Sequence, residues 1–147
     1  MCIRDSVQKV APYLELDSDP YPSVVDGRIV WIVDGYTTTD KFPGSELDSF
    51  KDMTSDTLQD DTGLRTLPTD EINYMRNSVK ATVDAYDGTV TLYAWDDADP
   101  ILKAWSAAFP GTVKPKTDIP AELMEHLRYP EDMFKVCLLY TSPSPRD

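Results

Sequence analysis

The amino-acid sequence predicts an α+β fold in which short helices pack on a small antiparallel sheet built from two Asp-Gly hairpins. Strand-like runs flank Asp26-Gly27, a second pair of runs flanks Asp87-Gly88, and most of the helical patterns follow the second hairpin. Strands followed by helices are typical of a sheet with helices covering one face. With 147 residues, the chain is long enough for one domain and short for two.

The first hairpin is predicted by the β-rich runs 23–25 and 28–33 on either side of Asp26-Gly27. An Asp-Gly pair between such runs favours a type I′ turn, because both central residues of that turn need a positive φ. Counting outward from the turn places Val25 opposite Arg28. The same count puts Ile29, Trp31 and Val33 on one face of the strand.

The second hairpin is predicted by alternation of apolar and polar residues over 79–86, followed by Asp87-Gly88 and the run 89–95. A two-residue loop would pair Ala85 with Val90, Val83 with Leu92, and Ala81 with Ala94. A helix over 71–85 is the competing interpretation, because Ile72, Met75, Val79 and Val83 keep near-helical spacing. The β-branched residues in 79–83 and the matched register favour strands.

Residues 37–69, between the hairpins, are rich in Thr, Ser and Asp and show no clear period. We expect a variable insertion there, with a short helix near residues 45–53. A helical turn or two is also predicted over residues 7–12, where a proline ends it.

Three helices are predicted after the second hairpin. The first has Asp99 as its N-cap and Pro100 at its first position, and it ends at Pro110-Gly111. Its apolar stripe comprises Ile101, Leu102, Trp105, Ala108 and Phe109. The second covers residues 120–128, with Leu123, Met124 and Leu127 facing inward, and a third begins at Pro130.

The composition argues against several classes of function. A net charge of −12, from 14 basic and 26 acidic residues, repels nucleic acid. Cys2 and Cys137 lie at the two ends and His126 is the single histidine, so a thiolate or structural zinc site lacks its ligands. We expect no cofactor. No apolar run in the sequence is long enough to span a membrane.

Both ends of the chain look foreign to the rest. Residues 1–6 and 137–147 resemble strings that recur where adapter sequence at the ends of metagenomic contigs is translated as protein. We therefore expect residues 7–136 to be the native fragment and exclude the two ends from the fold prediction.

Candidate sites are few. Asp96, Asp97 and Asp99 lack the spacing of a calcium loop, and Asp99 already serves as a helix cap. His126 has no accompanying nucleophile motif, and its place at a helix end gives a structural explanation. The sequence therefore nominates no catalytic, cofactor-binding or metal-binding residue. A possible binding face comprises Tyr86, Tyr93 and Trp95, on the side of the hairpin opposite its small apolar residues; packing against the rest of the full-length protein is the competing interpretation.

Five motifs in order resemble the uncharacterised protein family 0182: Asp19–Pro22, Val25–Tyr36, Asn77–Lys80, Asp84–Gly88 and His126–Glu131. The resemblance covers nearly all of residues 7–136 and departs at 37–69. It implies a large bacterial protein with several transmembrane helices and a long extracytoplasmic region, located at the cell membrane. It carries no established activity and no catalytic residues.

Two functions from different classes remain open. The favoured one is a non-catalytic extracytoplasmic module, structural or ligand-binding, whose partners are the remaining segments of its own full-length protein. Contact with the membrane would occur only through parts absent here. The alternative is an enzyme acting on an envelope polymer through carboxylates, completed by residues outside the fragment.

Overall fold

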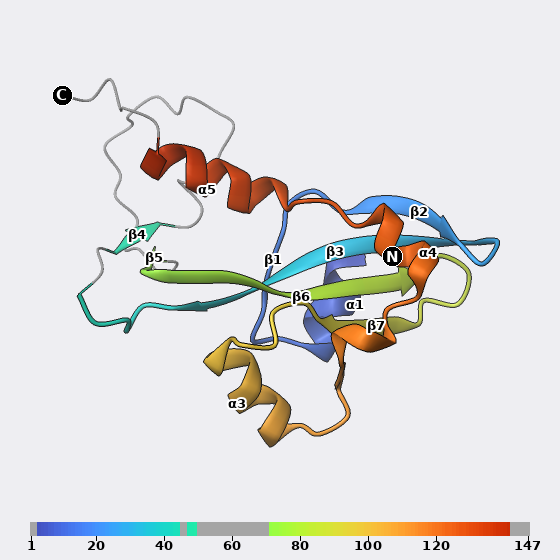
Figure 1. Cartoon of the computed structure of the whole chain (residues 1–147), viewed down its shortest axis with the longest axis horizontal. Coiled ribbons are helices and arrows are strands. Elements are labelled where there is room, and N and C mark those ends of the chain that lie inside the picture. The colour runs from blue at the N-terminus through green and yellow to red at the C-terminus, as the bar shows by residue number, and fades with distance from the viewer. Residues whose placement is uncertain (1–2, 45–46, 50–70, 142–147) are drawn as a thin grey trace.

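The computed structural model describes residues 3–44, 47–49 and 71–141 (Figure 1). Within them, a six-stranded sheet has the order β1–β3–β6–β7–β8, with β2 also paired to β3. The strands are β1 (Glu15–Leu16), β2 (Tyr21–Val25), β3 (Arg28–Thr39), β6 (Tyr74–Asp84), β7 (Val90–Ala94) and β8 (Val113–Lys114). The helices are α1 (Ile3–Val10), α3 (Pro100–Ala108), η1 (Lys116–Asp118), α4 (Ala121–His126) and α5 (Glu131–Thr141).

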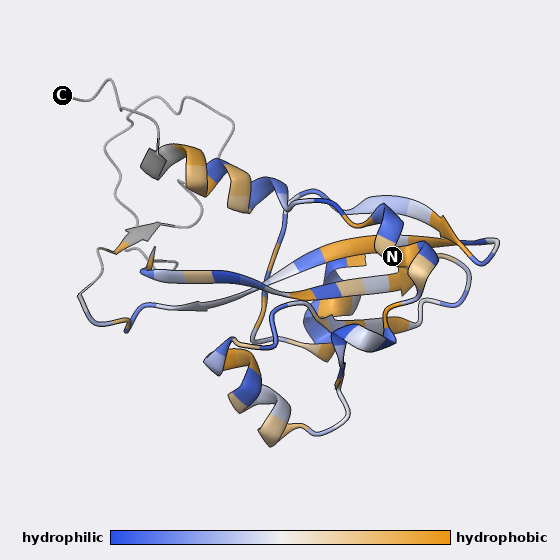
Figure 2. Cartoon of the chain, viewed as in Figure 1, coloured by the Kyte–Doolittle hydropathy of each residue, from blue (hydrophilic) through white to orange (hydrophobic). Residues whose placement is uncertain are grey.

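The α+β class is confirmed, but the expectation that helices cover one face of the sheet is wrong. Alternate residues of β3 enter two separate cores: Val33 packs with α1 and α3 residues, and Ile32 packs with residues of α4. Val7 and Leu102 belong to the first core, and Leu123 belongs to the second. Figure 2 shows the apolar residues of β3 concentrated near α4. The sheet is therefore the middle layer of the molecule.

The first hairpin forms as predicted. Val25 pairs with Arg28 and Val24 with Ile29. Asp26 and Gly27 have φ values of 50° and 73°, as both central residues of a type I′ turn require. Local turn chemistry is thus sufficient to set this register.

The second hairpin forms from strands, as predicted, but its register is shifted by two residues. Val83 pairs with Val90 rather than Leu92, and Ala81 pairs with Leu92 rather than Ala94; Ala85, predicted opposite Val90, follows the end of β6. The Asp84 carboxylate accepts a hydrogen bond from the Tyr86 backbone N–H (2.8 Å), and the Gly88 N–H donates to the Asp84 carbonyl (2.9 Å). These bonds favour a longer turn. A shift of two keeps the same apolar face inward.

The sheet is mixed rather than wholly antiparallel. β8 runs parallel to β7, with Leu92 opposite Val113 and Tyr93 opposite Lys114. Parallel neighbours need a crossover connection, and α3 provides it here. No pattern in the sequence indicated that residues 113–114 would pair with β7.

The predicted helices form, but their apolar stripes are only partly buried. In α3, Leu102 is buried, whereas Trp105 and Phe109 remain on the surface, where Trp105 stacks between Phe109 and Tyr13. In α4, Leu123 is buried, and Met124, predicted inward, is exposed. Short helices at the margin of a sheet therefore anchor through one side chain each.

Part of the segment predicted as a variable insertion is regular structure. Residues 37–39 continue β3, and β4 (Asp48–Ser49) pairs with β5 (Glu71–Ile72). The strand at 48–49 contradicts the short helix expected near residues 45–53 there. The other residues of that expected helix lie outside the described part, except Leu47.

Helices include residues from both excluded ends. α1 begins at Ile3, and α5 begins at Glu131, close to the predicted start, and continues to Thr141. Ile3 packs against the first core, and the Arg4 guanidinium donates to the Leu16 carbonyl (3.2 Å). The foreign origin of residues 1–6 and 137–147 stays a prediction.

Substituting Ile3 tests whether the first turn of α1 contributes to the stability of the fold. Ile3→Ser should lower the free energy of unfolding by about 1–2 kcal/mol, because it removes apolar surface packed on the core. Val10→Ser, on the exposed side of the same helix, is the matched control and should change it by less than about 0.5 kcal/mol. Urea denaturation followed by circular dichroism measures both. Equal effects would contradict the docking of Ile3.

Candidate functional site

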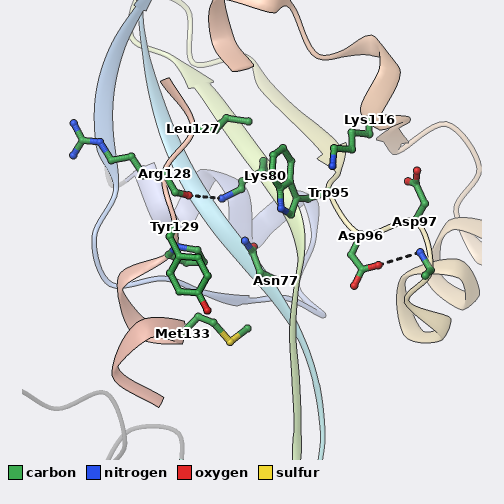
Figure 3. A pocket seen from close by; sticks show the side chains of 12 residues that line it. Asn77, Lys80, Trp95, Asp96, Asp97, Lys116, Leu127, Arg128, Tyr129 and Met133 are labelled. Carbon is green, nitrogen blue, oxygen red and sulfur yellow. Dashed lines mark hydrogen bonds between the residues drawn. The ribbon is translucent and has the colours of Figure 1, made fainter. Parts of the chain in front are cut away.

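A groove of about 730 Å³ opens between β6, the segment after β7, η1 and the start of α5 (Figure 3). This volume lies within the range of about 300–1,000 Å³ that small-molecule sites occupy. Its lining combines aromatic, charged and amide side chains: Asn77, Lys80, Trp95, Asp96, Asp97, Ala98, Lys116, Leu127, Arg128, Tyr129, Pro130 and Met133.

A β-bulge decides which side chains of β6 reach the groove. Gly35 pairs with Val79 and Tyr36 with Asn77, so Ser78 is an extra residue on β6. Without it, strict alternation would turn Asn77 away from Lys80. The bulge instead places Asn77 and Lys80 together at the groove and directs Ser78 toward α3.

A buried ion pair lies at the groove, with Lys80 in the groove lining and Asp34 behind it. The Lys80 ammonium contacts the Asp34 carboxylate, and both side chains are only 2% exposed. The ammonium also donates to the Arg128 carbonyl (2.9 Å). Burial raises the pKa of Asp34, and the charge of Lys80 opposes part of that rise. The pair therefore ties β3 and β6 to the chain that follows α4.

Asn77 is held beside this pair with half of its amide unused. It donates a side-chain hydrogen bond that lowers the pKa of Asp34. Its Oδ1 is buried and has no hydrogen-bond partner among the described residues. Buried acceptors of this kind are rare in native proteins and call for an explanation. In Figure 3, Asn77 lies between Tyr129 and Asp96.

Trp95 lies between two lysines. The Lys116 ammonium lies 4.0 Å from the centroid of the indole ring and the Lys80 ammonium 5.2 Å from it. Figure 3 shows the two amines to either side of the ring. Cation–π attraction to both amines holds the indole in place. Lys80 is buried, whereas Lys116 is partly exposed and can reach a ligand.

The rim carries opposite charges in near balance. Asp96 pairs with Arg76 (2.6 Å), and Asp97 is exposed. The Arg128 guanidinium packs over the Tyr21 ring, 4.8 Å from its centroid, and points away from the groove in Figure 3. The accessible charges facing the groove are thus those of Lys116 and Asp97.

A second buried network holds α5, which contributes Met133 to the groove. Asp17 accepts hydrogen bonds from the Tyr36 hydroxyl and from the Asp132 N–H (2.9 Å). The Asp132 carboxylate in turn accepts from the Ser18 hydroxyl (2.7 Å) and N–H (2.9 Å). Burial raises the pKa of Asp132, and the bonds from Ser18 oppose that rise. This network fixes one wall of the groove.

A third network caps α3 on the other side of the sheet. The Asp99 carboxylate accepts from the hydroxyls of Ser78 (2.6 Å), Tyr74 (2.6 Å) and Thr37. It also accepts from the N–H groups of Ile101 and Leu102, as predicted for an N-cap. Burial alone would raise the pKa of Asp99, but the hydroxyl hydrogen bonds outweigh it and lower that pKa.

The structure brings two of the three predicted binding residues together. Tyr93 is buried and Trp95 packs against the same core, because α4 and the residues before it cover this face. Tyr86 is 71% exposed and lies apart, packed against Arg28 at the hairpin turn. Of these three predicted residues, Trp95 is the one that lines the groove.

The other candidate residues from the sequence have roles in the fold or lie on the surface. Asp96 and Asp99 are held by the contacts above, and His126 is exposed in the last turn of α4. Within residues 3–44, 47–49 and 71–141, no group of three or more His, Cys, Asp or Glu side chains is placed to hold a metal ion.

Sequence reasoning missed Asn77, Lys80 and Lys116 as groove residues. Alternation places Lys80 among the polar residues of its strand, whereas the structure buries it at 1% exposure. Asp34, directly after the apolar run 29–33, was the available signal for a buried partner. Lys116 gives no local signal, because only the fold brings it to Trp95.

Comparison with known proteins gives a consistent family and no solved structure. Residues 2–140 match the uncharacterised protein family UPF0182. A UPF0182 protein of Nocardioides sp. is 70% identical over 132 residues, which are 90% of this chain and 13% of the relative. Relatives from Saccharopolyspora erythraea (62%) and Frankia casuarinae (60%) also match 90% of the chain, which covers 14% and 13% of their lengths. No solved structure matches.

Lys80→Met should lower the free energy of unfolding by about 3–5 kcal/mol, because it leaves the Asp34 carboxylate buried without its partner. The double variant Asp34→Asn, Lys80→Met should be less destabilised than Lys80→Met alone. Arg76→Met is the matched control, since it breaks a partly exposed pair worth about 1 kcal/mol or less. Chemical denaturation at neutral pH measures all three. A Lys80→Met variant as stable as the control would show that the pair is not needed.

Asp99→Ala should cost about 2 kcal/mol or more, because it removes the cap of α3 and leaves buried hydroxyls without an acceptor. Asp97→Ala, two residues earlier and exposed, should be nearly neutral. Thermal denaturation of both variants tests this, and equal melting temperatures would contradict the role of Asp99.

The pH dependence of stability gives a separate test of Asp99. Its pKa is lower in the fold than in the unfolded chain, so the unfolded state takes up its proton first as pH falls. The stabilisation by Asp99 is present above about pH 4 and is lost as pH falls through the folded-state pKa. Asp99→Asn should therefore lose less stability than the unmodified chain between about pH 5 and pH 2.5. An equal loss of stability in Asp99→Asn and in the unmodified chain would refute this role of Asp99.

Proposed function

The chain belongs to the uncharacterised protein family UPF0182, and on that basis we propose that it is a non-catalytic, extracytoplasmic module of a multi-pass membrane protein. The chain spans about 13% of the length of the curated relatives it matches. The resemblance of its motifs implies membrane helices in the remainder of such proteins. Within the described residues, no helix has the length and apolar character needed to cross a bilayer.

The observation that carries the non-catalytic assignment is the engagement of the buried carboxylates within the fold. Asp17, Asp34, Asp99 and Asp132 are each at most 2% exposed. Each is held by a lysine, a hydroxyl or a backbone N–H of the chain itself. None of them lines the groove. A catalytic acid or base must reach the substrate, so these side chains are better suited to holding the fold.

The remaining segments of the same full-length protein are the proposed partners. The outer face of α5 exposes Phe134 (55%), which would be covered by packing against neighbouring segments. The net charge of −12 disfavours nucleic acid as a partner.

A carboxylate enzyme acting on an envelope polymer is the second candidate. The observation in its favour is that burial raises the pKa of both Asp34 and Asp132, as a general acid requires. These carboxylates face inward, and movement of α5 would be needed to expose Asp132. The non-catalytic module requires no such movement, and we prefer it for that reason.

Labelling of introduced cysteines in intact cells tests the location. In the full-length protein without other accessible cysteines, Lys103→Cys should react with a membrane-impermeant maleimide, because this side chain is exposed on α3. Val7→Cys, at 0% exposure, is the matched control and should react only after denaturation. Labelling of Lys103→Cys only after the cells are permeabilised would place the module in the cytoplasm and refute the proposal.

A further inference from the structure

We propose that the groove beside Trp95 binds a neutral, hydroxyl-rich saccharide. This inference rests on the proposed function, because an extracytoplasmic module meets the saccharides of the cell envelope. The groove is bounded by Asn77 on β6, Trp95 after β7, Lys116 on η1 and Tyr129 before α5. Four separate parts of the chain thus contribute to it (Figure 3).

The Asn77 amide indicates what kind of group the ligand carries. Its nitrogen donates toward Asp34, which directs Oδ1 away from that carboxylate. Oδ1 is buried and has no donor within the described residues. A buried acceptor left unpaired is unfavourable, and a ligand hydroxyl that donates to it would remove that cost.

The accessible charges indicate a ligand without net charge. Lys116 offers a donor and Asp97 an acceptor in the groove lining, and Asp96 is already neutralised by Arg76. The Lys80 ammonium is neutralised by Asp34. An anion would gain from Lys116 and lose against Asp97, and a cation would do the reverse. Hydroxyl groups can both donate to Asp97 and accept from Lys116.

The apolar lining suits the carbon face of a sugar ring. Tyr129 is 64% exposed, and Leu127 and Met133 also line the groove. Aromatic side chains combine an apolar surface with polar atoms at their edge, as a saccharide does. The volume of about 730 Å³ gives room for more than one such ring.

A peptide ligand fits these residues less well. Extended peptides bind by adding a strand to a free sheet edge. At the groove, the Ser78 carbonyl of β6 already accepts from the Trp95 N–H (2.7 Å) and the Asp96 N–H (3.3 Å). The edge at that point is therefore closed, and side chains rather than backbone groups are presented to the ligand.

Nuclear magnetic resonance titration of the ¹⁵N-labelled 147-residue chain tests the inference. The probes are neutral cello-, malto-, manno- and chito-oligosaccharides, with inorganic phosphate and tetraglycine as comparators. At least one oligosaccharide should shift the Trp95 indole N–H and the Asn77 side-chain amide signals in a saturable manner. The Trp105 indole, on the outer surface of α3, is the internal control and should not shift.

Variants distinguish this groove from other surfaces. Lys116→Ala and Asn77→Leu should each weaken oligosaccharide binding by about tenfold, which corresponds to the loss of one hydrogen bond to the ligand. Lys103→Ala, an exposed lysine on α3, should leave the affinity unchanged. Lys116 is partly exposed, so its replacement keeps the test valid if Asn77→Leu does not fold.

Absence of shifts with every oligosaccharide, stronger shifts with phosphate or tetraglycine, or equal affinity in Lys116→Ala would overturn the saccharide site. Mass analysis of the oligosaccharide after incubation separates this inference from the proposed function. Binding without cleavage supports both. Cleavage would keep the saccharide site and refute the non-catalytic module, and failure to bind would leave the cysteine-labelling result unaffected.

Discussion

The buried ion pair between Asp34 and Lys80 is the interaction on which the arrangement of the molecule depends. It joins the two central strands, and through the Arg128 carbonyl it fixes the chain that enters α5. Both side chains are 2% exposed, so removing either charge would leave the other uncompensated in a medium of low polarity. The place of Lys80 in the groove lining, the position of Trp95 and the approach of α5 all follow from where this pair lies.

The extra residue at Ser78 lets one strand serve two polar networks. Ser78 faces Asp99 and the start of α3, while Asn77 faces the groove on the opposite side. In a regular strand Asn77 and Ser78 would likewise point to opposite faces. Asn77 and Lys80, three positions apart, would then also lie on opposite faces instead of sharing one. The bulge thus separates a fully hydrogen-bonded cap, which holds α3, from an amide in the groove lining whose buried oxygen is unpaired. β-Bulges commonly re-aim side chains next to binding sites in this manner.

Sequence reasoning succeeded where short-range chemistry decides the structure. The Asp26-Gly27 turn and the Asp99-Pro100 helix start depend on residues within a few positions, and both were predictable. The second register was missed because the Asp84 side chain competes for the backbone N–H groups of its own turn. The second core was missed because Lys80 and Asp34 look like surface residues until each is seen as the other's partner. The groove is lined by residues from four separate parts of the chain, and no local sequence pattern predicts that they come together.

The contact between Asp17 and Asp132 links residues 115 positions apart. A ribosome adds roughly 5–20 residues per second, so several seconds or more pass between the synthesis of the two partners. During that time Asp17 lacks the N–H it needs, and Lys80 similarly waits for the carbonyl of Arg128. The strands therefore cannot complete their polar contacts before the start of α5 has been synthesised. Completion of the polar contacts around the sheet is consequently a late event in the folding of this segment.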